Sequence, residues 1–161
     1  TARKNNIPIV YCNDSHVPSD RELKIWGAHA MKDTEGSEII DELKPHGGDR
    51  IVLKNSYSAF YNTELKNILD SLYNGQGVET IIFTGIHTDI CVKHSAYDAF
   101  LSGYDIIIAE DGIASPTIRK HRHGLDYMKS NYLVQVKSIK KILDDLRVLN
   151  PSKVAIKRRK K

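Results

Sequence analysis

Residues 84–96 read Thr84-Gly-Ile-His-Thr-Asp-Ile-Cys-Val-Lys-His-Ser-Ala96 and contain the most reactive candidate side chain, Cys91. They follow the apolar run 79–83 and lead into residues with helical periodicity, so we expect a strand, a turn and a helix. The Cys91 sulfur would then lie at the first helical turn, where unpaired N–H groups and the helix dipole favour the thiolate. A thiolate is a nucleophile, so this position suggests covalent catalysis. The alternative is a buried cysteine that acts as a small hydrophobe.

Strand and helix signals alternate along the chain. Apolar residues at helical spacing predict helices at 63–73, from Cys91 to Gly103, and at 139–146. Runs of β-branched or aromatic residues predict strands at 7–12, 50–54, 79–84, 105–110 and 132–136. Continuous apolar strands separated by helices are typical of a parallel sheet covered on both faces. The predicted fold class is therefore α/β, a three-layer αβα, Rossmann-like arrangement with a mostly parallel sheet and helices on both faces.

The strand ends indicate where chemistry would be located. Active sites of such sheets lie beyond the carboxyl ends of the strands. Lys54 ends the predicted strand 50–54, and Cys91 follows the predicted strand 79–84. We therefore expect these two side chains at the same edge of the sheet.

Composition predicts one domain and a basic tail. The chain has 161 residues, 40% of them hydrophobic, which is enough for a single core. We assign residues 1–150 to the domain. Residues 151–161 form a tail with six basic and no acidic residues, which we expect to be disordered. Without these six charges the net charge of +4 becomes −2, and no basic stripe with interleaved aromatics indicates nucleic-acid binding.

Two features concern location. No run is long or apolar enough to span a bilayer, so we expect no membrane partner. The two cysteines, Cys12 and Cys91, do not make a disulfide framework, which favours a reducing, cytoplasmic compartment. Cys12 lies inside an apolar strand and is expected in the core.

Several ordered motifs resemble one family. The chain from about residue 7 to about residue 136 resembles the isochorismatase-like cysteine hydrolases, which include nicotinamidases, N-carbamoylsarcosine amidases and isochorismatases. The matching motifs are Lys54 with Ser58-Ala-Phe60 and Thr63, residues 84–92, Trp26–Lys32, Gly36–Ile40 and Tyr104–Asp111.

The resemblance implies a covalent mechanism. Cys91 would attack an amide or ureido carbonyl, and Lys54 would lower the pKa of the thiol. The backbone N–H groups of His87 and Cys91 would form the oxyanion hole, with a cis peptide bond between Ile86 and His87. Release of ammonia or an amine would leave a thioester for water to cleave. Without the resemblance, Lys54 would be interpreted as a solvated charge at a strand end.

One departure from the family concerns the general base. Members begin with a strand that carries an aspartate, whereas this sequence opens with residues 1–6, which look like the end of the first family helix. We therefore expect the domain to be N-terminally incomplete, without a middle strand of the sheet. An inactive relative is the alternative.

A metal site and a pocket are further expectations. Asp14, His16, Glu22 and His29 resemble the metal ligands of nicotinamidases and suit one divalent ion, best of all zinc; loop capping is the alternative. Trp26, Tyr57 and Phe60 are candidates for the wall of a substrate pocket, or for core or interface packing. His121 and His123, among basic residues, are expected on a solvated helix face, where Arg119 is an alternative ligand for a substrate carboxylate.

The sequence therefore predicts a cysteine amidohydrolase that acts on a small amide or N-carbamoyl or ureido compound. The segment Trp26–Lys32 favours a carbamoyl substrate over nicotinamide. An isochorismatase-type vinyl-ether hydrolase and a non-catalytic member with a structural or docking role stay open as alternatives. A homo-oligomer is expected from the resemblance only.

Overall fold

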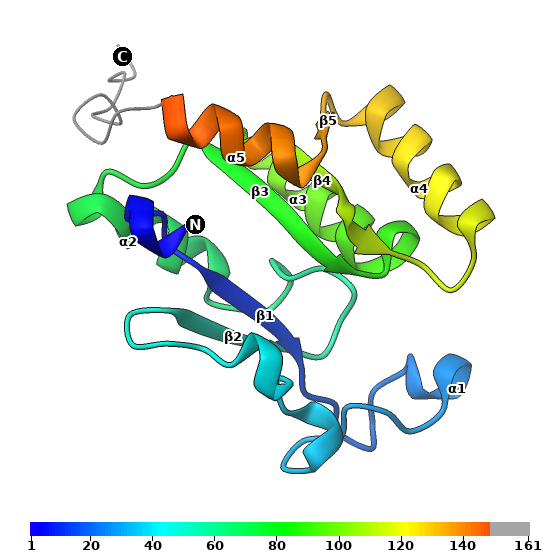
Figure 1. Ribbon diagram of the computed structural model, residues 1–161. Helices are drawn as coiled ribbons and strands as arrows, with labels where there is room; N and C mark the ends of the chain where they lie inside the picture. The colour runs from blue at the N-terminus through cyan, green and yellow to red at the C-terminus, as the bar shows by residue number, and fades with distance from the viewer. Residues whose placement is uncertain (149–161) are drawn as a thin grey trace.

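Five parallel strands form the centre of the fold of residues 1–148. A computed structural model describes residues 1–148, so the predicted tail lies outside the described residues. The strands are β1 (Val10–Asp14), β2 (Arg50–Lys54), β3 (Thr80–Ile86), β4 (Asp105–Ala114) and β5 (Gln135–Lys137). All pairings are parallel, but the strands divide into two sheets, β1-β2 and β3-β4-β5 (Figure 1).

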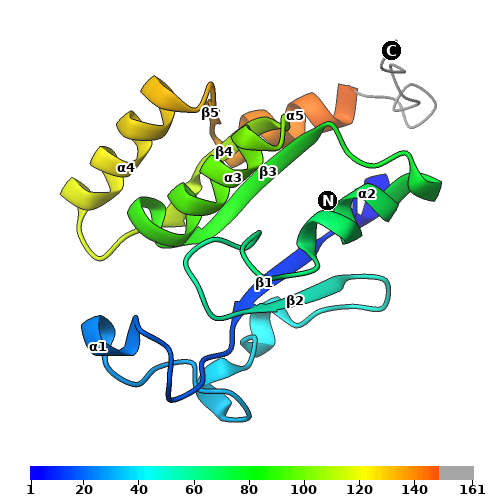
Figure 2. The same cartoon turned by 180° about the vertical axis from the view of Figure 1, so that it is seen from behind.

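Helices cover the larger sheet on both faces. The α-helices are α1 (Leu23–Trp26), α2 (Leu65–Gly75), α3 (Lys93–Leu101), α4 (Ile118–Asn131) and α5 (Ile139–Val148). Short 3₁₀ turns lie at Arg3–Asn5, Glu35–Ser37 and Asp41–Leu43. Helices α3 and α4 lie on one face of β3-β4-β5 and α5 lies on the other, as Figures 1 and 2 show from opposite sides. The predicted α/β class with parallel strands and flanking helices is confirmed.

The main core lies between the larger sheet and helices α3 and α4. Small residues of α3, Ala96 and Ala99, are fully buried and allow the helix to approach the sheet closely. They pack against Ile106 and Ile108 of β4 and against Met128 of α4. The β-branched residues of β4 suit a buried strand, and their burial supplies the main hydrophobic stabilisation of this half.

A second core joins α2 to the smaller sheet. Leu65 and Leu69 lie on one face of α2 and pack with Val52 of β2. Because side chains alternate along a strand, Ile51 and Leu53 point to the opposite face of β2, where they are 51% and 57% exposed. Phe60 packs against both cores and links them.

Several strand boundaries and one burial prediction needed correction; the strands predicted at 79–84 and 105–110 extend to Ile86 and Ala114. The first strand was predicted at 7–12 and begins at Val10; the last was predicted at 132–136 and runs from Gln135 to Lys137. The core position predicted for Cys12 is wrong, because the side chain is exposed on β1, which pairs with β2 along one edge only among residues 1–148. In that range, no helix is long and apolar enough to cross a membrane.

Candidate active site

Cys91 lies in a π-helical turn between β3 and α3. This turn, Thr88–Val92, is closed by the Val92 N–H group, which donates to the His87 carbonyl oxygen at 3.1 Å. The peptide bond between Ile86 and His87 is cis, as the resemblance implied. The π-helical turn continues without a break into α3, which begins at Lys93. The half-buried thiol therefore lies in the first turn of the helical segment, where the sequence placed it.

Lys54 brings a buried cation next to this thiol. It ends β2, is 7% exposed, and places its Nζ atom 4.0 Å from the Cys91 Sγ atom. The same ammonium group donates to the Ser56 carbonyl oxygen at 2.9 Å and to the Asp14 carboxylate. Asp14 is the register partner of Lys54 in the β1–β2 pair, so the two side chains share one face. The ends of β1, β2 and β3 thus meet at one place, as the strand pattern predicted for Lys54 and Cys91.

The groups around Cys91 shift the pKa of its thiol in opposing directions. Burial raises the pKa of Cys91, and the charges of Asp14 and Glu22 raise it further. The Lys54 charge and a hydrogen bond from the His87 backbone lower this pKa, but the net direction is upward. Desolvation is the largest of these effects, and the Lys54 charge is the largest that favours the thiolate.

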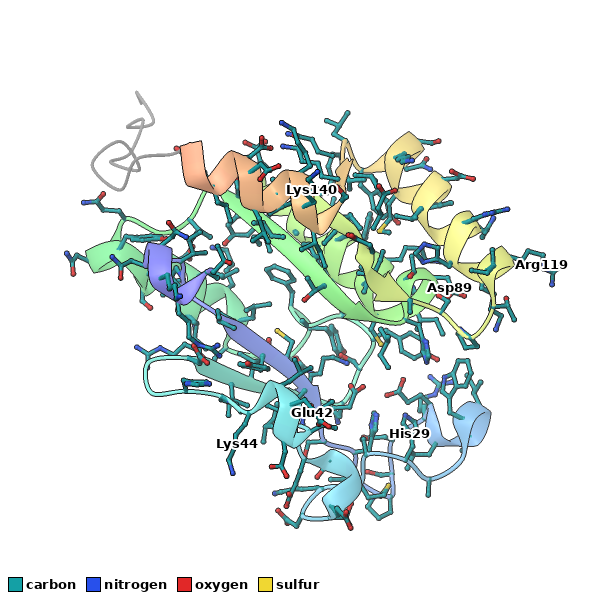
Figure 3. The ribbon with its side chains drawn as sticks, viewed as in Figure 1. His29, Glu42, Lys44, Asp89, Arg119 and Lys140 are labelled. Carbon is teal, nitrogen blue, oxygen red and sulfur yellow. The ribbon has the colours of Figure 1, made fainter. Side chains whose placement is uncertain are left out.

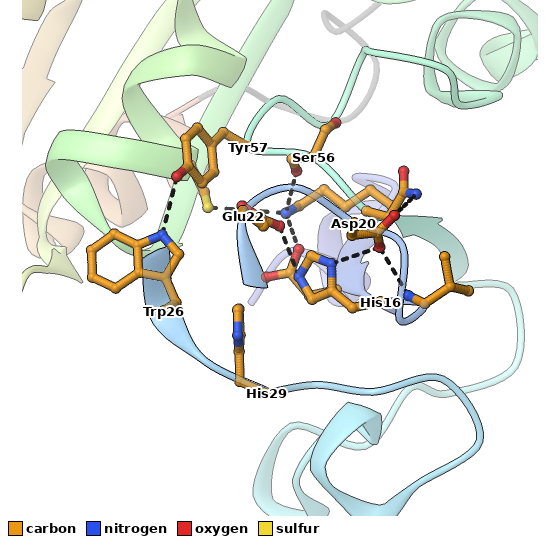
Figure 4. A network of polar contacts seen from close by, with 12 residues as sticks. His16, Asp20, Glu22, Trp26, His29, Ser56 and Tyr57 are labelled. Carbon is orange, nitrogen blue, oxygen red and sulfur yellow. Dashed lines mark hydrogen bonds and ion pairs between the residues drawn. The ribbon is translucent and has the colours of Figure 1, made fainter. Parts of the chain in front are cut away.

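A cavity of about 300 Å³ opens onto the thiol. Eight residues line it: Asp14, Glu22, Trp26, His29, Ile86, His87, Ile90 and Cys91. Its rim is held by the Trp26 Nε1–H group, which donates to the Tyr57 hydroxyl at 3.0 Å (Figure 4). The Tyr57 ring in turn lies 5.4 Å from the His94 ring of α3. Trp26 thus lines the cavity, whereas Tyr57, also predicted in the pocket wall, does not line it and instead accepts the hydrogen bond of the Trp26 indole.

The pocket role predicted for Phe60 is wrong. Its ring packs against both cores and lies 6.1 Å from the Tyr104 ring, and it does not line the cavity described within residues 1–148. The apolar ring is stabilised more by the interior between α2 and α3 than by a cavity lined with carboxylates and imidazoles.

Three of the four predicted metal ligands converge. Ligand atoms of His16, Glu22 and His29 all lie within 4.8 Å of one another, and Figure 4 shows the three side chains facing one centre. Asp14 is not in this group, because its carboxylate pairs with Lys54. The described residues thus divide the predicted set between a three-ligand cluster and an ion pair.

His16 provides a test of whether a metal fits. The residue is 0% exposed, and its Nε2 atom lies 2.8 Å from a Glu22 carboxylate oxygen without making a hydrogen bond of acceptable geometry. A buried nitrogen and a carboxylate that face each other at the wrong angle for a hydrogen bond suit two ligands of one cation. Imidazole and carboxylate donors are those that zinc prefers.

Asp20 supports this cluster, and the sequence analysis did not identify it as a site residue. Its carboxylate lies 3.1 Å from His16 Nδ1 and accepts hydrogen bonds from the Val17 N–H group and the Asn55 side chain. The Val17 hydrogen bond lowers the pKa of Asp20, with smaller contributions from His16 and Asn55. A carboxylate behind a ligating histidine fixes the ring orientation, and the i, i+4 spacing from His16 was the available signal.

The interpretation of helix α4 needed one correction. His121 was expected on a solvated face, but it is half-buried and its Nδ1 atom lies 2.9 Å from the Thr88 hydroxyl oxygen. Arg119 is exposed and points away from the fold at the beginning of α4 (Figure 3).

The loop residues Ser58 and Thr63 make hydrogen bonds that hold the loop in place. The Ser58 hydroxyl donates to Asp98, and the Thr63 hydroxyl donates to the Ala59 carbonyl oxygen.

Comparisons with known proteins agree on one family. Residues 1–140 match the isochorismatase domain model. The chain is 31% identical to the uncharacterized isochorismatase family protein YaaI of Bacillus subtilis, over 89% of this chain and 76% of that protein. It is 33% identical to the ureidoacrylate amidohydrolase RutB of Yersinia enterocolitica, over 73% of this chain but only 46% of that protein.

Solved structures lead to the same conclusion. The N-carbamoylsarcosine amidase of Thermoplasma acidophilum is 42% identical with a TM-score of 0.77, over 85% of this chain and 75% of that one. The nicotinamidase PncA of Bacillus subtilis is 28% identical with a TM-score of 0.76, over 85% of this chain and 78% of that one. Fold, site geometry and sequence therefore converge, and the chain belongs to the isochorismatase family.

Proposed function

We propose that this protein is a cysteine amidohydrolase that cleaves a C–N bond of a small amide or of an N-carbamoyl or ureido compound. The observation that carries the proposal is the Lys54 ammonium group, 4.0 Å from the Cys91 sulfur at the edge of one cavity. A buried cation beside a thiol at the end of a parallel strand is an arrangement for generating a nucleophile. Relatives named as amidohydrolases and amidases support the reaction class.

The chemistry follows from the positions of the groups. The Cys91 sulfur attacks the carbonyl carbon after its proton is removed, and the carbonyl oxygen becomes an oxyanion. The backbone N–H groups of His87 and Cys91 are the proposed donors to this oxyanion. The C–N bond then breaks, the nitrogen leaves with a proton as ammonia or an amine, and a thioester remains. Water cleaves the thioester and restores the thiol.

Proton transfer requires a carboxylate near the sulfur. The family resemblance assigns this role to an aspartate that precedes Thr1. Among residues 1–148, Asp14 is the carboxylate that both lines the cavity and binds Lys54. We therefore propose that Asp14 orients Lys54 beside Cys91, and that an extended protein with the family aspartate would exchange the proton with Cys91 through the carboxylate of that aspartate.

One divalent ion fits the cluster on the other side of the cavity. We propose that His16, Glu22 and His29 hold it, with Asp20 fixing the His16 ring. When bound, such an ion supplies a Lewis acid that can ligate a substrate heteroatom or a water molecule. The three side chains would then orient the substrate opposite Cys91, since Glu22 and His29 line the same cavity.

A carbamoyl or ureido compound is the proposed substrate. The relatives named as ureidoacrylate amidohydrolase and N-carbamoylsarcosine amidase are 33% and 42% identical to this chain, against 28% for the nicotinamidase. All of these substrates are small enough for a cavity of about 300 Å³.

Ammonia release from a panel of substrates tests the proposal. The panel contains N-carbamoylsarcosine, ureidoacrylate, N-carbamoylglycine and nicotinamide, and it is applied to this chain and to a version extended upstream, each free of metal or loaded with zinc. We expect turnover of the carbamoyl compounds by the extended protein, and its loss in Cys91→Ala. Cys12→Ala, which removes the exposed thiol, is the matched control and should retain activity. A folded, extended protein that releases ammonia from no compound of the panel would contradict the proposal and favour a non-catalytic role.

A further inference from the structure

The segment from the end of β4 into α4 contacts the two residues at the start of the nucleophile turn. The Ser115 hydroxyl donates to the Asp89 carboxylate at 2.5 Å and accepts from the Asp89 backbone N–H group at 3.4 Å. The His121 Nδ1 atom lies 2.9 Å from the hydroxyl oxygen of Thr88, which is 0% exposed. Thr88 and Asp89 lie three and two residues before Cys91, respectively, so these contacts act on the turn that holds the sulfur.

Gly124 brings the backbone of α4 against the same two residues. A Cβ atom at this position would lie 2.9 Å from the Asp89 Cα atom, 3.0 Å from the Asp89 nitrogen and 3.1 Å from the Thr88 carbonyl carbon. All three are backbone atoms, which cannot move aside by rotating a side chain. Since ordinary van der Waals contact begins at about 3.4 Å, any larger residue at position 124 has to displace either the helix or the turn.

We propose that α4 is the support that fixes the position of Cys91, and that Gly124 and His121 are positioning residues for the nucleophile. This inference rests on the proposed function, in which Cys91 is the attacking group. Ser115 and His121 hold the turn by hydrogen bonds, and Gly124 permits the close approach on which both bonds depend.

The charges around the sulfur explain why a small displacement matters. Lys54 of β2 and the His87 N–H group stabilise the thiolate, whereas Asp14 of β1 and Glu22 of the loop before α1 oppose it. The Lys54 Nζ atom lies 4.0 Å from the sulfur, at the limit of a hydrogen bond to sulfur. A turn displaced by about half an ångström weakens both favourable contacts, and misplacement on this scale lowers rates by about tenfold or more.

A pair of glycine variants tests the proposal in this 161-residue chain. Gly124→Ala is compared with Gly112→Ala, both in a Cys12→Ser background so that Cys91 is the thiol that reacts. A Cβ atom at Gly112 would meet the Ala109 Cβ atom and the Ile139 Cδ1 atom at 3.2 Å, on the side of the sheet that α5 covers. It is therefore a tightly packed glycine against side chains rather than against the nucleophile turn.

The readout is the rate of Cys91 alkylation by iodoacetamide between pH 6 and pH 10, together with kcat and KM for any amide that the extended protein hydrolyses. We expect Gly124→Ala to shift the midpoint of the alkylation profile upward by about half a pH unit and to lower kcat about tenfold, with KM within about twofold of the parent. Gly112→Ala should leave midpoint and kcat unchanged. Superimposable alkylation profiles of the two glycine variants overturn the proposal.

A second pair of variants covers the case in which Gly124→Ala does not fold. His121→Ala removes the partner of Thr88, whereas His121→Asn retains a hydrogen-bonding group of similar reach. An upward shift in His121→Ala that His121→Asn reverses supports the proposal, and equal profiles overturn it. Alkylation does not depend on turnover, so a shifted profile in a protein without amidase activity would contradict the proposed function and not the role of α4.

Discussion

At Lys54, the last residue of β2, a buried ammonium group is shared by a carboxylate, a backbone carbonyl and a thiol. A buried cation is tolerated when it is paired, and the Asp14 carboxylate provides that pair. The pairing has a cost for reactivity, because the Asp14 charge raises the pKa of Cys91 while the Lys54 charge lowers it. The two residues therefore set the protonation of the thiol in opposite directions.

Replacing Asp14 with asparagine should make Cys91 more reactive toward alkylation near pH 8. The amide removes a negative charge that raises the pKa of Cys91, so the thiolate forms at lower pH and the rate rises by about two- to threefold. Lys54→Met should have the opposite effect and move the profile to higher pH. The measurement is the pH dependence of the iodoacetamide rate in a Cys12→Ser background. Asp41→Asn, at a carboxylate that is 97% exposed, is the control and should not move the profile.

Zinc should stabilise the protein through the three-ligand cluster of His16, Glu22 and His29. A ligand at about one hundred times its dissociation constant contributes about 2.7 kcal/mol, which raises Tm by about 5–10 °C in a domain of this size. Glu22→Gln should remove most of this rise, because a carboxylate ligand becomes a neutral amide. Glu38→Gln, at an exposed position, is the matched control for charge. Equal zinc-induced shifts in the two variants would exclude Glu22 as a ligand.

At the scale of elements, the connection between β2 and α2 is fastened to α3 by side-chain hydrogen bonds. Ser58 is buried, with 8% of the residue exposed. Its hydroxyl donates to the Asp98 carboxylate and accepts from the Phe60 N–H group. The Ser95 hydroxyl of α3 accepts from the Ala59 N–H group at 2.9 Å. Tyr57 belongs to this connection and accepts a hydrogen bond from Trp26. The hydrogen bonds of Ser58 and Ser95 therefore also determine where Tyr57 meets Trp26.

Ser58→Ala should lower the free energy of unfolding by about 1–3 kcal/mol. The loss leaves a carboxylate and a backbone N–H group without their partner in the interior. Ser71→Ala removes an exposed hydroxyl that donates to the Ile68 carbonyl oxygen within α2, and it should change stability by less than about 0.5 kcal/mol. Urea titration of both variants gives the comparison. If Ser58→Ala lowers the free energy of unfolding no more than Ser71→Ala does, the hydrogen bonds of Ser58 are not stabilising contacts.

Element types followed from the sequence because each is determined by local pattern. The strand at 50–54 coincides with β2, and the apolar face of Leu65 and Leu69 lies on α2 as predicted. The positions of Lys54 and Cys91 followed from strand ends in the same way. The pairing of the Asp14 carboxylate with Lys54 and the burial of His121 could not be predicted from the sequence, because each depends on a partner far along the chain. Local periodicity holds no information on such pairings.

At the scale of the whole molecule, two cores stabilise two separate sheets. One core lies between β3-β4-β5 and helices α3 and α4, and the other lies between β1-β2 and α2. The aromatic rings of Phe60 and Tyr104 and the side chain of Ile81 pack against both. The cavity lies where the halves meet, since β1 provides Asp14 and the nucleophile turn provides Cys91.

Phe60→Ala should therefore loosen the contact between the halves. The substitution removes a ring that packs against both cores, at a cost of about 3 kcal/mol. Amide hydrogen exchange should accelerate more in β1, β2 and α2 than in β4, because the smaller core has four buried residues against eight in the larger one. Ile108→Ala, at a fully buried residue of the larger core, is the control and should accelerate exchange in β4 at least as much. Uniform acceleration in Phe60→Ala would show that the two halves open as one unit.

The register of the β1–β2 pair has a consequence for how this protein can change. Asp14 and Lys54 are brought together by the pairing of their strands, although residues 15–53 separate them along the chain. The same intervening residues include Glu22, Trp26 and His29, which face the far side of the cavity. Insertions and deletions there can remodel the substrate end of the cavity and leave the pair beside Cys91 in place. Under the proposed function, the strand pairing thus keeps the Asp14–Lys54 pair beside the nucleophile while the loop shapes the substrate end, so a new substrate can be acquired without rebuilding that pair.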